Sequence, residues 1–520
     1  MLTNIIGRER EIKALDEIYN SSKSEFVAVC GRRRVGKTFL IKEFFDEKIC
    51  FSVSGMIHGK TNAQLKIFVN RLRRYGMTID RPVNDWIDAF DLLMDYLSSL
   101  SVQRKVVFFD ELPWLDTPRS NFISALENFW NTFVSDRHDI VLIVCGSATS
   151  WMFDKLINNH GGLHNRITRR ILLEPFNLHE TEQLLTTNGF NFSKYEISEC
   201  YMVLGGIPYY LSLLKKELTL SQNIDFLLFD TRGDLYSEID NLYASLFSNS
   251  DDYIKVVKAL SQNSLGLTRN EILSETGIKT GGTISTILKN LETCGFIRSY
   301  RQIGNSLKDL NYQLTDFYTL FYFKFKNGLT VKDRRYWSEI QGTAEFYTWA
   351  GFTFEILVLS HIQQIKQKLG ILGVISEEFS CRIPAENNEN GTQIDLIISR
   401  KDNTVNLCEI KFSINEFEIS ADYEKTLRNR IDLFRKKYLK RTQSLQLTFV
   451  TTFGVKKTYT LGLSTMKFCW TICLRIYHNL HFVTLCAHTK FTATTATPTA
   501  ICQIFVNASP ANVIKHCFNI

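Results

Sequence analysis

Long apolar runs are missing from this chain of 520 residues. The longest, such as Val141–Cys145 and Ile356–Leu359, are far too short to cross a bilayer. The start of the chain also lacks the apolar core of a secretory signal, because the charged run Arg8–Glu11 stands where that core would be needed. We therefore expect a soluble protein of the cytoplasm with no membrane partner.

Acidic residues are missing from one long segment. Thr458–Ile520 contains no Asp or Glu, four basic residues and five of the chain's 12 cysteines. Cys469 and Cys473 have a spacing compatible with a metal-binding module, but no second close cysteine pair follows. Without this segment the chain has 57 basic and 54 acidic residues and 7 cysteines. The net charge of +7 is therefore poor evidence for a nucleic-acid partner, and the cysteine count is poor evidence for metal.

A shift of the reading frame explains this segment better than a metal site does. Codons for Lys457–Leu474, read two bases out of step, permit an acidic sequence that includes Glu-Ile-Leu-Leu-Asp-Asp-Leu-Phe. Lys456 and Lys457 are a natural slippage site if both codons are AAA. We hypothesise that residues 458–520 are an out-of-frame tail without an evolved function, and resequencing of the gene would test this.

Length and composition predict several folded domains. A hydrophobic content of 44% and a charged content of 22% are typical of globular proteins and exclude a disordered or collagenous chain. At about 100–200 residues per domain, the length suggests three or more domains. We expect domains at residues 1–240, 250–330 and 340–457, followed by the tail at 458–520.

A phosphate-binding loop is predicted near the N-terminus. The apolar strand pattern Phe26–Cys30 is followed by Gly31-Arg-Arg-Arg-Val-Gly36-Lys37-Thr38 and then by an amphipathic helix pattern. In this context the glycines let backbone N–H groups wrap phosphates, and the helix N-terminus adds its dipole. Lys37 would reach the β- and γ-phosphates, and Thr38 would bind Mg²⁺.

Two further strand patterns end in the residues that such a loop requires. Lys105–Phe109 leads into Asp110, which would hold Mg²⁺ through water, and Glu111, which would polarise the attacking water as general base. A capping role for Glu111 is the alternative. Ile140–Cys145 leads to Ser147, whose hydroxyl can sense the γ-phosphate or cap the following helix.

These motifs resemble those of the archaeal-type P-loop ATPases of the AAA+/STAND group. Gly7 and Arg8 match a box that in the family sits beside the nucleotide base, and Leu204–Tyr210 match its Gly-Gly-x-Pro lid motif. The resemblance is continuous to about residue 240. It implies an α/β fold with a parallel sheet and a helical lid, with ATP and Mg²⁺ bound.

The resemblance also implies an arginine finger and allows a homo-oligomer. Gly161–Arg166 lies where the family carries the finger, and Arg166, Arg169 and Arg170 are all candidates for the role, although a solvated basic face explains each of them as well. Closed rings are common among AAA+ relatives, but no residue pattern sets a number of subunits.

The middle of the chain has the pattern of a winged helix-turn-helix. Helix patterns at Asp252–Ser261, after a capping box at Thr268, and at Gly282–Leu291 precede two short strand patterns around a polar turn. The third helix could dock in the DNA major groove with Lys289 near phosphates, but it carries Glu292 and almost no arginine. An interaction or lid module is therefore the open alternative.

The C-terminal part has the element order of the PD-(D/E)XK nucleases. A long helix pattern at Ala344–Leu369 precedes three strand patterns, a charged helix and a last strand. Asp395 on the second strand and Glu409 on the third would hold Mg²⁺, and Lys411, on the same face as Glu409, would position or activate the attacking water. Glu355 on the helix is a fourth candidate. A DUF234-like domain with these nuclease-related features often ends the archaeal-type ATPases, which this part resembles.

Two functions therefore stay open. The first is an ATP-hydrolysing enzyme whose nucleotide state controls a metal-dependent, DNA-acting nuclease-like domain. The second is a nucleotide-switched regulator that binds DNA or protein through a catalytically inactive nuclease fold.

Overall fold

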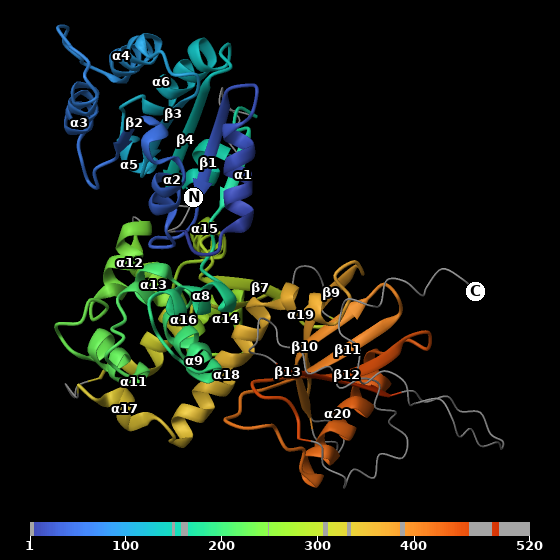
Figure 1. Cartoon of the computed structure of the whole chain (residues 1–520). Coiled ribbons are helices and arrows are strands. Elements are labelled where there is room, and N and C mark those ends of the chain that lie inside the picture. Colours follow the sequence, from blue (N-terminus) through green and yellow to red (C-terminus); the bar gives the residue numbers. More distant parts are fainter. Residues whose placement is uncertain are drawn as a thin grey trace.

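Figure 1 shows three parts in this computed structural model: an N-terminal part around a sheet, a mostly helical middle, and a C-terminal part around a second large sheet. The structure describes residues 5–147, 151–157, 165–247, 249–304, 310–329, 334–384 and 391–456, and the backbone of 481–487. Apart from that backbone, the tail predicted at 458–520 lies outside these residues, as does most of the predicted arginine-finger segment. In the described ranges, no helix has both the length and the apolar character needed to cross a membrane.

The N-terminal sheet is parallel throughout, in the order β2-β3-β4-β1-β5. Its strands are β1 (Glu25–Cys30), β2 (Ile49–Ser54), β3 (Lys105–Asp110), β4 (Ile140–Gly146) and β5 (Arg169–Leu172). The three strands predicted around the nucleotide motifs are all present. Because parallel strands end at the same edge of the sheet, the residues that follow β1, β3 and β4 come together there.

Helices cover both faces of this sheet because its buried strands are apolar on both sides. Alternate residues of β1, such as Val27 and Val29, pack with α1 (Glu9–Tyr19) and α2 (Lys37–Phe45). The intervening residues, such as Phe26 and Ala28, pack with the helices of the other face. Those helices are α3 (Thr61–Arg74), α4 (Trp86–Ser99), α5 (Leu112–Leu115) and α6 (Phe122–Phe129). This part also contains the short 3-10 helix η1 (Asp46–Lys48) and the π-helices η2 (Trp130–Val134) and η3 (Met152–Ile157).

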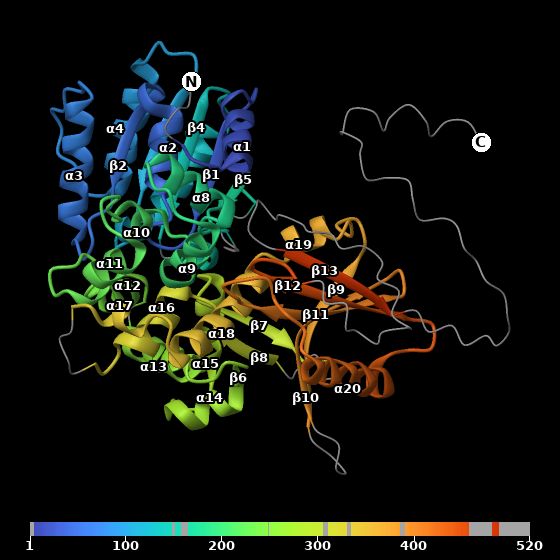
Figure 2. The same ribbon diagram turned by 60° about the horizontal axis from the view of Figure 1, so that its bottom comes forward.

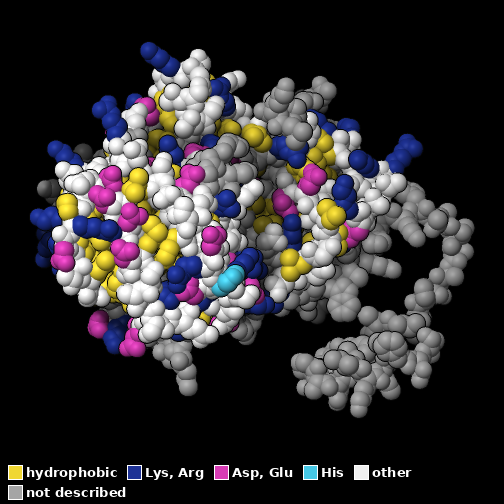
Figure 3. All heavy atoms as spheres, turned by 90° about the horizontal axis from the view of Figure 1, so that it is seen from above, with side chains coloured by type: hydrophobic (Ala, Val, Ile, Leu, Met, Phe, Trp, Pro, Cys, Tyr) yellow, Lys and Arg dark blue, Asp and Glu magenta, His cyan; other side chains and the backbone are white. Residues whose placement is uncertain are grey.

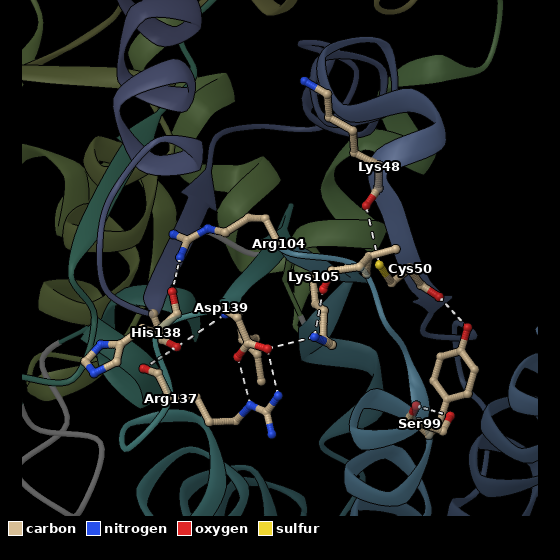
Figure 4. A network of polar contacts seen from close by, with 12 residues as sticks. Lys48, Cys50, Ser99, Arg104, Lys105, Arg137, His138 and Asp139 are labelled. Atoms are coloured by element: carbon tan, nitrogen blue, oxygen red, sulfur yellow. Dashed lines mark hydrogen bonds and ion pairs between the residues drawn. The ribbon is translucent and has the colours of Figure 1, made fainter.

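A polar network holds the amino ends of β3 and β4, at the edge opposite the nucleotide motifs (Figure 4). Lys105 Nζ donates to Asp139 Oδ2 at 2.7 Å, and Arg137 makes two bonds of 2.8 and 2.7 Å to the same carboxylate. The bonds from Arg137 hold the pKa of Asp139 well below its usual value. Arg104 adds bonds to the carbonyl oxygens of His138 and Ile18. This network ties the two central strands together away from the site.

The lid and the middle part follow the parallel sheet. The lid contains α8 (Leu178–Thr187), α9 (Lys194–Leu204), α10 (Pro208–Ser212), α11 (Leu220–Ile224), η4 (Asp225–Phe229) and α12 (Glu238–Leu246). The middle contains α13 (Ser250–Ser261), β6 (Leu267–Thr268), α14 (Arg269–Thr276), α15 (Gly282–Thr293), β7 (Ile297–Arg301), β8 (Leu310–Leu314), α16 (Phe317–Phe321), η5 (Tyr322–Lys326) and α17 (Tyr336–Ile340). The small antiparallel sheet has the order β6-β8-β7. At Thr268 both bonds of the predicted capping box form.

The C-terminal sheet is mixed, in the order β13-β12-β11-β10-β9. Its elements are α18 (Ala344–Ser360), α19 (Ile362–Lys368), β9 (Ser376–Ile383), β10 (Thr392–Arg400), β11 (Thr404–Lys411), α20 (Ala421–Tyr438), β12 (Ser444–Thr451) and β13 (His481–Ala487). Only β11 and β12 run parallel to each other. One face packs with α18 and the other with α20, which Figure 2 shows against the sheet. The backbone of β13, in the predicted tail, pairs with β12.

The single long helix predicted at Ala344–Leu369 is wrong. The structure breaks it into α18 and α19 at His361, whose backbone leaves helical geometry. The His361 ring is buried: Nδ1 lies 2.8 Å from the carbonyl oxygen of Leu357, and Nε2 accepts a bond from the backbone N–H of Leu178 at 3.1 Å. The hydrogen bond between His361 and the lid offsets the free energy lost where the helix is interrupted. The periodicity of the local sequence cannot reveal such a distant partner.

Candidate functional site

The phosphate-binding loop follows β1 directly and leads into α2. Gly31 has φ +152° and Gly36 has φ +93°, conformations that a side chain rarely adopts. A Cβ at Gly31 would lie 2.3 Å from the carbonyl oxygen of Leu173, so only glycine lets the loop pass this close to the chain beyond β5. The two glycines therefore set the path of the loop.

Lys37 is buried inside this loop. Its ammonium group donates to the carbonyl oxygens of Gly31 at 2.8 Å and Arg32 at 2.9 Å, and to the Ser147 hydroxyl at 3.1 Å. Burial lowers the pKa of Lys37, and the nearby carboxylate of Glu111 opposes that shift. The lysine predicted to bind phosphate thus lies between the loop backbone and the end of β4.

The acids predicted after β3 lie beside Thr38 and Ser147. The Thr38 hydroxyl donates to Asp110 Oδ2 at 2.9 Å, and burial raises the pKa of Asp110. Glu111 accepts from the Ser147 hydroxyl at 2.5 Å and from its backbone N–H at 3.2 Å. A hydroxyl and a buried carboxylate are hard oxygen donors, which suit Mg²⁺. These five residues, counting Lys37, form one continuous polar site.

Gly7 and Arg8 reach the same loop from the N-terminal side. The Arg8 guanidinium donates to the carbonyl oxygens of Val35 at 3.2 Å and Glu174 at 2.8 Å, and it lies over the Phe176 ring at 4.6 Å. Burial lowers the pKa of Arg8. Gly7 has φ +61°. The predicted box therefore borders the phosphate loop, and its contact with a nucleotide base stays a prediction.

The lid motif also contacts the loop. The backbone N–H of Tyr209 donates to the carbonyl oxygen of Arg34 at 3.5 Å. Gly206 accepts from the backbone N–H of Phe176 at 2.8 Å. The lid is thus connected both to the loop and to the chain that leads away from β5.

The three candidate finger arginines lie on or near β5, the strand that pairs with β1. Arg166, Arg169 and Arg170 are exposed, at or just before β5. Arg170 donates to the carbonyl oxygen of Ile157 at 3.5 Å. Among the described residues, no hydrogen bond joins any of the three to Lys37 or Glu111, so a finger role for Arg166 stays a prediction.

A second cluster gathers the predicted C-terminal residues. Lys411 Nζ lies 3.0 Å from Glu409 Oε1, and burial together with the charge of Asp395 raises the pKa of Glu355 to about 8. The pKa of Asp395 is also raised, by burial and by Glu409. The prediction that α18, β10 and β11 bring their charged residues together is consistent with these electrostatic effects.

Two residues of this cluster were not predicted from the sequence. The hydroxyl of Tyr423 and the guanidinium of Arg430, both on α20, bond to Glu409. Burial raises the pKa of Glu409, but Lys411 and Arg430 outweigh it and hold that pKa below its usual value. Both carboxylate oxygens are therefore engaged, and within the described part of the chain no group of three or more acids, histidines or cysteines is arranged to hold a metal. The Mg²⁺ site predicted at Glu355, Asp395 and Glu409 stays a prediction.

Sequence reasoning also missed contacts from the loop to the lid and to the middle part. Arg32 pairs with Asp316, and Arg34 pairs with Glu238, over long separations in sequence. No local motif marks either acid.

Comparison with known proteins gives two relatives from Methanocaldococcus jannaschii. The chain is 27% identical to an uncharacterized protein over 357 residues, which cover 67% of this chain and 75% of the relative. It is 42% identical to an uncharacterized ATP-binding protein over 43 residues, which cover 8% of this chain and 73% of that relative.

Similar solved structures include the following two proteins. The Walker-type ATPase of Pyrococcus abyssi is 18% identical with a TM-score of 0.43, and the alignment covers 62% of this chain and 96% of that one. The ORC2 protein of Aeropyrum pernix is 14% identical with a TM-score of 0.40, over 65% of this chain and 97% of that one.

The family model of the ATPase domain predominantly from Archaea matches residues 5–214. The matched range contains the phosphate loop, Asp110, Glu111 and Ser147. Residues 5–214 are therefore similar to this family of ATPase domains.

Proposed function

We propose that this chain binds and hydrolyses ATP, and that the state of the nucleotide controls a C-terminal, nuclease-like part that acts on DNA. The observation that carries the ATPase assignment is the contact chain from Lys37 through the Ser147 hydroxyl to Glu111. It joins the residue suited to bind phosphate to the residue suited to activate water.

Each residue of the ATP site has a distinct task in this proposal. Lys37 and the loop N–H groups bind the phosphates, and Ser147 orients Glu111 toward the attacking water. Thr38 and Asp110 would hold Mg²⁺, which neutralises charge on the phosphate oxygens. The raised pKa of Asp110 fits this assignment, because a buried carboxylate is stabilised by a nearby cation.

The Lys37→Ala variant tests the ATP site. We expect it to lose ATP binding by calorimetric titration and ATP turnover by phosphate release. Lys42→Ala is the matched control, because Lys42 is an exposed lysine on the same helix. Unchanged nucleotide affinity and turnover in Lys37→Ala would refute the assignment.

The DNA-directed part of the proposal is supported by the cluster around Glu409 and Lys411. It is not supported by a broad basic surface: on the face seen in Figure 3, Lys and Arg side chains are interspersed with Asp and Glu among the described residues. Affinity for DNA that came from phosphate contacts alone would need such a surface. On this face, recognition would therefore depend on a localised site.

A second candidate function is favoured by the contacts of Glu409. Because Lys411, Tyr423 and Arg430 already satisfy its carboxylate, the cluster resembles a salt-bridged remnant of a nuclease site. In this alternative, the chain is a nucleotide-switched regulator that binds DNA or a protein partner without cleaving it.

Incubation with plasmid DNA separates the two functions. The protein would be mixed with plasmid and Mg²⁺ or Mn²⁺, with and without ATP, and the products resolved on agarose. Cleavage that Asp395→Ala and Lys411→Ala abolish, but that Lys401→Ala retains, supports the nuclease. Lys401 is the control because it is an exposed lysine in the β10–β11 turn. Intact plasmid with continued ATP hydrolysis supports the regulator.

A further inference from the structure

Arg32, the second residue of the phosphate loop, is buried and paired outside the ATPase domain. Its side chain is only 4% exposed, and its guanidinium lies over the Phe296 ring at 4.7 Å. It forms an ion pair with Asp316, whose side chain is 2% exposed. Asp316 lies between β8 and α16, more than a hundred residues beyond the end of the matched ATPase domain at residue 214. The loop is thus held by a charge from another part of the chain.

Asp316 is itself held firmly in place. As the N-cap of α16, it accepts bonds from the backbone N–H of Thr319 at 3.0 Å and from the Thr319 hydroxyl at 2.5 Å. The same hydroxyl lies 3.1 Å from the hydroxyl of Tyr243 on α12. The position of the carboxylate that pairs with Arg32 therefore depends on the positions of α16 and α12.

The neighbouring loop arginines make similar contacts. Arg34 Nη1 lies 2.9 Å from Glu238 Oε2, and Glu238 accepts a bond from the Tyr210 hydroxyl at 2.9 Å. Arg33 donates to the carbonyl oxygen of Asn241 at 3.4 Å. All three arginines of the loop therefore contact α12 or the start of α16, elements that follow the matched range 5–214.

Arg32 is also joined directly to the phosphate-binding lysine. The Lys37 ammonium donates to the carbonyl oxygen of Arg32 at 2.9 Å. A buried charge that loses its counterion cannot stay where it is without a large penalty, so its backbone shifts or water enters. A shift of Arg32 would displace an acceptor of Lys37 and the N–H groups that wrap phosphate.

We infer that Asp316 is a positioning residue for phosphate binding, which acts through Arg32 and makes the nucleotide site depend on the middle part of the chain. This inference rests on the proposed function, because it assumes that residues 31–38 bind a nucleotide. Asp316 does not itself touch the phosphates; it sets the loop that does.

The Asp316→Asn variant tests this role. Asparagine keeps the N-cap acceptor for α16 but removes the charge that pairs with Arg32. We expect the Kd for ATP and the KM for ATP hydrolysis to rise at least ten-fold, with kcat changed less than three-fold, because the loop binds phosphate in both the ground and the transition state. Asp316→Glu, which keeps the charge, is expected to recover most of the affinity. Asp85→Asn is the matched control, since Asp85 is the exposed N-cap of α4.

The outcomes separate this inference from the proposed function. If the unaltered chain fails to bind ATP, the proposed function fails. If the unaltered chain binds ATP and Asp316→Asn binds it equally well, the positioning role is overturned. The same holds if Asp316→Asn lowers only the fraction of protein that binds ATP and leaves the Kd unchanged.

A double variant provides a second test in case Asp316→Asn folds poorly. Arg32→Gln/Asp316→Asn leaves no buried charge unpaired, so its loss of affinity should be smaller than the product of the two single losses. Losses that multiply would overturn the pairing.

Discussion

At the scale of single residues, burial gives the site its chemistry. Lys37, Asp110 and Ser147 are each no more than 7% exposed, so their interactions are screened little by water. Glu111 adds an unusual backbone, with φ +47°, a conformation that is uncommon for a residue with a side chain. The carboxylate bonds to the Ser147 hydroxyl beyond β4 and makes no capping bond to α5, so a catalytic role for Glu111 stays our proposal.

Glu111→Gln should separate hydrolysis from binding. Glutamine can still accept from Ser147 but is a far weaker base, so we expect kcat to fall about 100-fold or more while ATP affinity changes less than about three-fold. Phosphate release and calorimetric titration measure the two quantities. Glu47→Gln, at an exposed position just after α2, serves as the control. Unchanged turnover in Glu111→Gln would show that another residue is the general base.

Glu199 makes stability depend on pH. It is buried on α9 and accepts bonds from Trp337 Nε1 at 3.2 Å and Gln341 Nε2 at 2.6 Å. Burial raises its pKa from 4.5 to about 7. Because the folded protein binds this proton more tightly than the unfolded chain, the associated stability is complete below pH 4.5 and is lost as the pH rises through about 7.

Glu199→Gln should remove this dependence. Relative to the variant, the unaltered chain is expected to lose up to about 3 kcal/mol of stability between pH 4.5 and 8. Urea unfolding of both proteins at pH 5 and pH 8 gives the difference. A difference that stays the same at the two pH values would contradict the prediction.

At the scale of elements, the lid motif depends on close backbone packing. Gly206 has φ +64°, and a Cβ there would lie 2.2 Å from the carbonyl oxygen of Phe176. Gly277, which ends α14, has nearly the same φ of +67° but no atom within 4 Å of the added Cβ. Alanine at either position adopts a left-handed backbone, but only at Gly206 does it also clash. Comparing the two variants therefore separates the cost of the backbone strain from the cost of the steric clash.

Gly206→Ala should destabilise the protein far more than Gly277→Ala. The left-handed backbone costs alanine about 1 kcal/mol at either position. At Gly206 the Phe176 backbone must also move, so we expect several kcal/mol in total and a weaker contact of Arg8 with the Phe176 ring. Thermal unfolding of both variants tests this, and equal losses would show that the clash is relieved elsewhere.

At the scale of the whole molecule, the parts are packed together rather than strung on linkers. One apolar cluster runs from a face of the N-terminal sheet through the lid and the middle part to the C-terminal sheet. Tyr195 on α9 stacks on Phe412, just after β11, with ring centroids 5.0 Å apart. The end of β7 bridges to β9 at Gln302 and Ser380. This continuity gives the nucleotide site a physical route to the C-terminal sheet.

A chain that ends at Lys456 should keep the nucleotide site. This truncation removes β13 and leaves β12 at the edge of the sheet, so we expect the C-terminal sheet to unfold at a lower temperature. ATP affinity should stay within about two-fold, because Lys37 and Asp110 belong to the other large sheet. Calorimetric unfolding and ATP titration measure both effects. Loss of ATP binding would show that the segment after Lys456 supports the nucleotide site.

The sequence by itself determined the structural features that depend on near neighbours. The phosphate loop, the acids after β3 and the capping box at Thr268 were predicted, because each is a strand end, turn or helix start that a few adjacent residues specify. The long helix through His361 was predicted wrongly, because a partner on the lid decides its break.

Only the tertiary structure decided which distant charges meet. Arg32 and Asp316 lie 284 residues apart, and nothing near either one indicates the pair. Tyr423 and Arg430 likewise joined the Glu409 cluster only when α20 packed on the sheet. The free energy of such a pair depends on mutual burial, which is a property of the packed chain and not of any local segment.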